Sequence, residues 1–197
     1  MSKRSVCLLV VFLVAVTVRP TSAATITYTE SATASGTLGG VTFTNALITL
    51  TVVGDTAGVF NAGGTLLENL GAGTVDIAGF PTATFTDSML AFANSVNSAV
   101  GISKVFGASI LDFLDTFDPA FIPYGLNTSI GPITGPALSA PSFVFNTTAG
   151  QLILSAAPST STFRAVVASP SAVPEPASLL LLGTGVAGTM LRRRKRA

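Results

Sequence analysis

The chain has 197 residues, 48% of them hydrophobic and only 10% charged, and its formal net charge is +1. It contains no histidine and a single cysteine. These counts exclude Ser-His-Asp and Cys-His nucleophilic systems, histidine acid/base chemistry and the usual zinc or copper sites.

Residues 1–23 have the pattern of a secretory signal peptide. Two basic residues near the start precede an apolar run at 6–18, and small residues precede the cleavage position. We expect cleavage after Ala23, with cleavage after Ala24 as the alternative. Because Cys7 stands near the start of the apolar run, a lipoprotein attachment site is not expected. The leader implies export by the general secretion machinery.

Residues 24–158 are predicted to form one β-rich extracytoplasmic domain, followed by a final strand and linker at 159–172. Residues 24–172 carry two basic and eight acidic side chains, a net charge of −6. A body so poor in lysine and arginine has no basic patch for phosphates, which argues against nucleic acid as a partner. Its apolar content argues against disorder. Because no cysteine remains in it, core packing and hydrogen bonds must hold it together.

Alternating β-branched and polar residues, interrupted by glycine and proline, predict an all-β fold with a single antiparallel β-sandwich-like domain. Residues 87–97 are expected to be strand or loop rather than helix. Residues 119–141 contain five prolines and are predicted to be a long loop. The predicted strands are 25–29, 41–44, 46–53, 73–77, 82–86, 101–105, 142–145, 151–155 and 161–167.

The densest group of acids in the body is Asp112, Asp115 and Asp118. Our first interpretation is that these are solvated turn residues, since Asp118 precedes a proline and Asp-Pro is typical of turns. Carboxylates also supply oxygen ligands to Ca²⁺, although this spacing does not match a known calcium loop. A carboxylate pair could hydrolyse a glycosidic bond, but the sequence identifies no such pair. No cofactor is therefore expected, with Ca²⁺ as the alternative.

The C-terminal tail has three parts. Residues 177–191 are uncharged and would form a helix of about 22 Å, a marginal length for a transmembrane helix. The prolines before this segment keep the backbone extended and exposed, and the basic run after it holds the carboxyl end in the cytoplasm. The motif before the helix is Pro174, Glu175 and Pro176, and the basic run is Arg192, Arg193, Arg194, Lys195 and Arg196.

This tail resembles the PEP-CTERM sorting signal of bacterial exported proteins, and the resemblance covers residues 173–197. It implies that exosortase, a membrane-embedded cysteine transpeptidase-like enzyme, recognises Pro174, Glu175 and Pro176. The protein would then be anchored transiently in the inner membrane and travel to the cell surface or extracellular matrix. An ordinary single-pass anchor is the alternative interpretation.

The leading functional interpretation is a non-enzymatic surface or matrix protein linked to biofilm or exopolysaccharide. The sorting step rests on the tail, whereas the matrix role is implied only by the family resemblance. The alternatives are a calcium- or carbohydrate-binding secreted module and, as a third, a secreted glycosidase.

Overall fold

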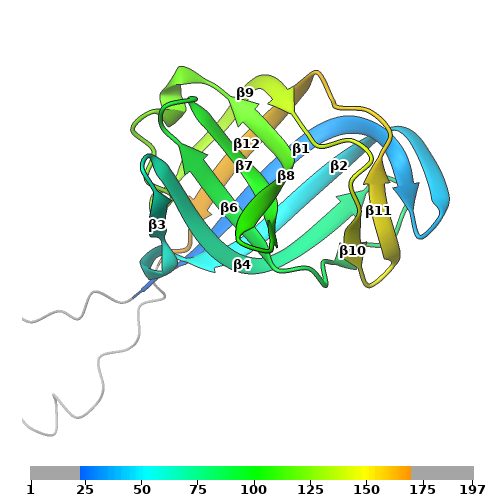
Figure 1. Cartoon of the computed structure of the whole chain (residues 1–197), viewed down its shortest axis with the longest axis horizontal. Coiled ribbons are helices and arrows are strands. Elements are labelled where there is room, and N and C mark those ends of the chain that lie inside the picture. Colours follow the sequence, from blue (N-terminus) through cyan, green and yellow to red (C-terminus); the bar gives the residue numbers. More distant parts are fainter. Residues whose placement is uncertain (1–22, 170–197) are drawn as a thin grey trace, which may run out of the picture.

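The computed structural model describes residues 23–169. The regular secondary structure of this part of the chain is almost wholly antiparallel strand (Figure 1). The predicted strand at 25–29 extends much further than expected, and residues 41–53 form one strand rather than two. The elements are β1 (Thr25–Leu38), β2 (Val41–Asp55), η1 (Thr56–Gly58), β3 (Phe60–Gly63), β4 (Leu66–Ile77), β5 (Ala83–Thr84), β6 (Met89–Asn94), β7 (Ala99–Phe106), β8 (Ser109–Phe117), η2 (Pro119–Phe121), β9 (Ile130–Leu138), β10 (Phe145–Thr147), β11 (Gly150–Leu154) and β12 (Thr160–Val167).

Eight of these strands close into a barrel, in the order β1-β12-β9-β8-β7-β6-β4-β2, and the long β1–β2 hairpin completes the ring. The hairpin turns at Gly39 and Gly40, which both have positive φ. On the other side of β1, the ring closes where Ile26 pairs with Val167. The prediction of antiparallel all-β structure is confirmed, but the sandwich is wrong. Inward and outward side chains alternate in both architectures, so local patterning does not distinguish them.

The sheet forks beside this ring. β12 pairs with the first half of β1, whereas β11 pairs with its far end. Phe85, just after β5, forms a bridge with Thr147 of β10, and Thr148 N–H donates to Thr84 O at 2.8 Å. β1, β2 and β4 therefore also belong to a second, smaller closure through β5, β10 and β11. The β10–β11 hairpin is visible at the right of Figure 1. The two closures separate beyond β4, which pairs with β6 in the eight-stranded ring and with β5 in the smaller closure. We call this place, with β6 and β7 on one side and β5 and β10 on the other, the fork.

Aromatic side chains fill the core at both ends of the barrel. At the fork, the rings of Phe113 and Phe145 lie 4.3 Å apart, edge to face. Seven phenylalanines of the described part are buried. They are Phe43, Phe85, Phe92, Phe113, Phe121, Phe145 and Phe163.

The described chain enters and leaves the barrel at one end (Figure 1). Ala24 N–H donates to Thr56 Oγ1 at 3.1 Å, and Ala168 N–H donates to Thr25 O at 2.8 Å. We call this the terminal end. The segment from η2 to Leu126 packs its buried side chains into this end of the barrel. There Tyr28 OH donates to Leu126 O at 2.5 Å.

The sequence misjudged residues 109–141. Residues 109–117 form β8, which was not predicted, and the expected loop contains η2 and β9. β9 tolerates Pro132 and Pro136 because residues 130–136 pair with β12 alone, while β8 pairs only with Ala137 and Leu138. Proline is accepted on a strand edge, where its missing N–H is not needed by a neighbouring strand. Within 87–97, β6 confirms the preference for strand over helix.

No helix in the described part is long and apolar enough to cross a membrane. The predicted helix at 177–191, the basic run behind it and the leader before Ala23 lie outside the described residues.

Candidate functional site

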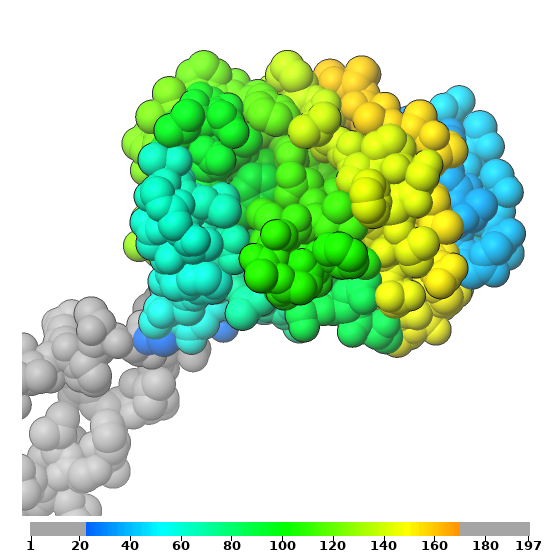
Figure 2. Space-filling view, viewed as in Figure 1, coloured from blue at the N-terminus to red at the C-terminus, as the bar shows by residue number. Residues whose placement is uncertain are grey.

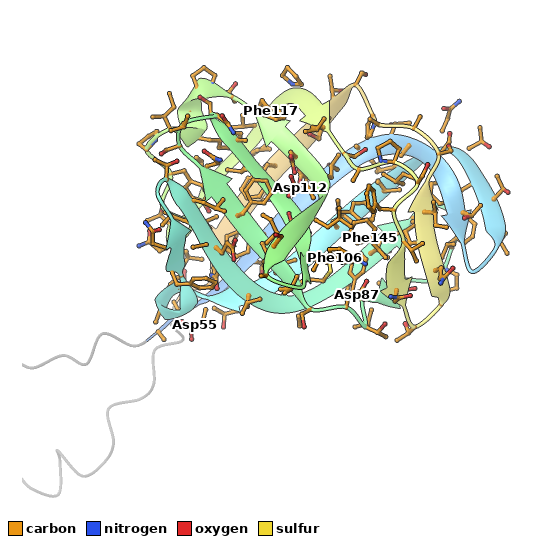
Figure 3. All side chains as sticks on the ribbon, viewed as in Figure 1. Asp55, Asp87, Phe106, Asp112, Phe117 and Phe145 are labelled. Atoms are coloured by element: carbon orange, nitrogen blue, oxygen red, sulfur yellow. The ribbon has the colours of Figure 1, made fainter. Side chains whose placement is uncertain are left out.

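A β-bulge in β8 decides where two of the predicted acids lie. β7 pairs one residue with Leu114 and the next with Asp112, so Phe113 is the extra residue. On a regular strand, residues three apart face opposite sides. The extra residue shifts this phase, which places Asp112 and Asp115 on the outer face and turns Phe113 and Leu114 into the core. Figure 3 shows Asp112 on this wall of the barrel.

Asp115 is nearly enclosed, with 3% of its surface exposed. It fits against Gly101 of β7, because a Cβ there would lie 2.5 Å from Asp115 Oδ1 and 2.7 Å from the ring of Phe92. Among the described residues, Oδ1 has no hydrogen-bond partner. Burial raises the pKa of Asp115 to about 8, and the nearby charge of Asp112 adds to the effect.

The other two predicted acids have separate partners. Ser103 Oγ donates to Asp112 Oδ1 at 2.8 Å. Asp118 caps η2, accepting a hydrogen bond of 2.8 Å from Ala120 N–H, which confirms its role in a turn. The structure thus brings Asp112 and Asp115 into electrostatic contact, while Asp118 is engaged in its own cap. Within residues 23–169, no group of three or more histidine, cysteine or acidic side chains is arranged to hold a metal ion.

A fourth acid, Glu30 of β1, lies inside the barrel and was missed by the sequence reasoning. It is fully buried and its Oε1 lies 2.7 Å from Thr116 Oγ1. Thr116 Oγ1 lies 2.6 Å from Ser161 Oγ, which donates to Asp115 O at 2.9 Å. A usable signal was present in the sequence, since Glu30 has the same strand parity as Ile26, which faces the core.

Two hydroxyl groups connect these contacts. Thr116 Oγ1 donates to Glu30 Oε1, Ser161 Oγ donates to Asp115 O, and either hydroxyl can donate in the contact between Thr116 and Ser161. Glu30 Oε2 has no hydrogen-bond partner among the described residues. A buried oxygen without a partner fits a neutral carboxylic acid better than a carboxylate.

The electrostatics of Glu30 agree with a neutral carboxylic acid. Burial raises its pKa well above the ordinary value; the hydrogen bond to Thr116 opposes the shift, and the charges of Asp115 and Asp112 add to it. A proton is thus held at the centre of the barrel, where the side chain has no exposed surface. Such a group can stabilise a fold, but a substrate cannot reach it without opening the wall.

An apolar groove of about 550 Å³ lies outside the barrel, between the β3–β4 hairpin and the tip of the β7–β8 hairpin, which stands forward in Figure 2. Glu68 is its one acid among the lining residues, 8% exposed, and burial raises its pKa. The principal apolar lining residues are Phe60, Leu66, Leu70, Val105 and Ile110.

The described residues thus form a closed β-barrel domain with one carboxylic acid, Glu30, inside it and a second buried one, Asp115, in its wall. In the sequence this domain is followed by a tail. Residues 172–195 of that tail match the family model of the PEP-CTERM protein-sorting motif. The chain carries this sorting motif, as predicted from its tail, and the motif implies processing by exosortase and export toward the cell surface. No curated protein and no solved structure matches the chain.

Proposed function

We propose that this protein is a non-enzymatic component of the bacterial cell surface or extracellular matrix. Its leader directs it through general secretion, and residues 177–191 hold it in the inner membrane until exosortase acts at the motif. The observation that carries the proposal is the sorting motif at 172–195, which begins a few residues after β12 ends at Val167. A folded domain is thereby joined to a processing signal by a short linker.

The placement of the acids supports a non-enzymatic role. Glycosidases use two carboxyl groups on either side of a substrate. Here Glu30 is enclosed inside the barrel and engaged with Thr116, whereas Asp115 is enclosed in the outer face against Gly101. A sugar ring cannot lie between them while the wall is intact.

The outer wall offers hydroxyl groups to a polysaccharide, which supports a link to the biofilm matrix. Thr29 of β1 pairs with Thr51 of β2, and Thr51 pairs with Thr74 of β4, so their side chains form a row across three strands. Threonine hydroxyls both donate and accept hydrogen bonds. They can therefore exchange hydrogen bonds with the hydroxyls of an exopolysaccharide strand.

The processing step is tested by fractionating cells with and without exosortase and sequencing both ends of the recovered protein. We expect the mature chain to start at Ala24 and to have lost Arg192 through Arg196 only when the enzyme is present. An intact tail in both strains contradicts the proposal.

Two tail variants separate the motif from the anchor. Replacing Pro174 and Pro176 by alanine should abolish processing while membrane retention persists. Replacing the basic run 192–196 by alanines should weaken retention, because those charges resist translocation. Equal retention of that variant and the wild type contradicts the role of the charges.

The alternative of a binding module is tested by titrating the protein with Ca²⁺ and with exopolysaccharide in a calorimeter. Heat from Ca²⁺ that disappears in Asp112→Asn would favour a calcium module. Glycoside hydrolysis that disappears in both Glu30→Gln and Asp115→Asn would favour the glycosidase and overturn the non-enzymatic proposal.

A further inference from the structure

The fork contains the one lysine of the described residues, and its surroundings are unusual. Lys104 is 8% exposed, with its Nζ 5.1 Å from the ring centre of Phe145 and 5.9 Å from that of Phe106. Nζ donates to Val144 O at 2.6 Å and lies 3.2 Å from Asp87 Oδ2. Figure 3 shows Asp87, Phe106 and Phe145 gathered at this place.

The same carboxylate holds the side chain of Asn146. Asn146 Nδ2 donates to Asp87 Oδ1 at 3.0 Å, and Asn146 N–H donates to Asp87 Oδ2 at 2.8 Å. An amine and a carboxamide, from β7 and β10, are thus bound to the two oxygens of one acid. Lysine is a nucleophile once it loses its proton, and a carboxamide carbon is an electrophile.

We propose that Lys104 and Asn146 join through an intramolecular isopeptide bond, with Asp87 as the group that moves the proton. This modification goes beyond the proposed function and does not depend on it.

The reaction needs no other reagent. Lys104 passes a proton from its ammonium group to the Asp87 carboxylate, and the neutral amine attacks Cγ of Asn146. Asp87 then returns the proton to the amide nitrogen, the bond from Cγ to that nitrogen breaks, and ammonia leaves. The ammonia takes up the second proton that the Lys104 nitrogen must lose to become an amide, and so leaves as ammonium. One positive charge is therefore present before and after the reaction.

The local environment suits each part. Burial alone would raise the pKa of Asp87, but the hydrogen bonds from Asn146 and Lys104 and the Lys104 charge outweigh it, so this pKa lies below its ordinary value. Asp87 is therefore in the base form that the first step requires. Holding two reacting groups together replaces a bimolecular encounter by a step within one molecule. Asn146 is exposed, which gives ammonia a path to solvent.

The bond has a structural purpose at this position. β10 joins the segment around and after β5 at one isolated β-bridge, Phe85 to Thr147, and a few hydrogen bonds beside it, among them Thr86 N–H to Asn146 O at 2.9 Å. A covalent link from Lys104 to Asn146 would fix the β10–β11 hairpin to the eight-stranded ring. A secreted body without cysteine would gain the kind of cross-link that disulfides give other exported domains.

Trypsin mapping of the purified, folded full chain tests the proposal. Trypsin cuts after free lysine and arginine, and a lysine whose Nζ forms an amide is not cut. We expect no cleavage after Lys104 and one peptide that ends at Arg164 with a mass lower than its sequence by one ammonia. Cleavage after Lys104, with both products at full sequence mass, overturns the proposal.

Matched variants identify the partners. Lys104→Arg keeps the positive charge beside Asp87 but cannot form this bond, so its peptides should keep full mass. Asp87→Asn keeps the shape but loses the base; with its fold checked by circular dichroism, it should remain unlinked. A link that persists in Asp87→Asn, or a wild-type peptide lacking one water through an amide to Asp87, overturns the assignment.

Discussion

Thr116 Oγ1 of β8 lies 2.7 Å from Glu30 Oε1 of β1, although 86 positions separate the two residues in the chain. The contact crosses the interior of the barrel and continues to Ser161 of β12. Three strands of the ring are therefore joined by one internal chain of hydrogen bonds. Burial raises the pKa of Glu30, and its second carboxyl oxygen has no partner among the described residues, so the neutral form of this acid belongs to the fold.

Glu30→Gln should keep the barrel folded, since the amide oxygen can accept from Thr116 Oγ1 as Glu30 Oε1 does, and the amide is neutral like the protonated acid. Thr116→Val should cost about 1–3 kcal/mol, because it leaves a buried polar group without its partner. Denaturant unfolding of both variants at pH 5 measures the two effects. Equal losses in the two variants contradict the neutral-acid assignment.

The stability of the protein should fall as the pH rises. Folded Asp115 has a pKa raised from 3.8 to about 8 by burial, so the folded state holds more protons than the unfolded state between these two values. The contribution of Asp115 to the free energy of unfolding is therefore complete below pH 3.8 and is lost as the pH rises through about 8. The loss is on the order of a few kcal/mol. Glu30, whose pKa is also raised by burial, acts in the same direction.

Thermal unfolding between pH 4 and pH 8 checks this sign. Asp115→Asn, which cannot ionise, should flatten the decline, and Asp118→Asn, a change at the cap of η2, should leave the decline unchanged. A wild-type protein that becomes more stable toward pH 8 contradicts the placement of both buried acids.

Gly101→Ala should destabilise the barrel by about 1–3 kcal/mol, as overpacking of a filled site does. The new Cβ would lie 2.6 Å from Leu114 O as well as against Asp115. Gly125→Ala is the matched control, because its Cβ would come no closer than 3.4 Å to another atom. Unfolding midpoints that fall equally in both variants contradict the tight fit.

Phe145→Ala should cost about 3–5 kcal/mol, since it removes a large ring from the core at the fork. Its ring packs against both Phe113 and Phe85. Phe143→Ala, two residues earlier, removes a ring that is 49% exposed and should cost far less. Chemical denaturation compares the pair, and similar losses would contradict the closure of the fork.

The local content of the fold could be predicted from the sequence, but its closure could not. Alternation identified β12 and the start of β1 because each has a buried side and an outer side. Their pairing, Ile26 with Val167, joins residues at the two ends of the domain. A pairing between residues so far apart is not visible in the local sequence pattern. In a barrel and in a sandwich alike, each strand alternates inward and outward side chains, so the pattern does not distinguish the two.

The candidate site was predicted in part. Asp112 and Asp115 were identified as acids of interest, but the interpretation that they are solvated turn residues is wrong, because both lie on β8 and Asp115 is buried. The bulge at Phe113 puts both on the outer face, and the sequence does not reveal a bulge whose extra residue packs against Phe145. Glu30 was assigned no role, although its parity in β1 could have placed it inside.

The position of β12 has a consequence for how the protein is made. On the export route proposed above, β1 is the first of the described strands to cross the membrane, and β12, which completes the ring beside it, is the last. Until residues 160–167 arrive, part of β1 presents unpaired backbone groups, the feature that recruits foreign strands and leads to aggregation. On that route the ring can close only when the sorting tail is about to reach the translocon, so a polypeptide that ends before residue 160 does not form the closed barrel.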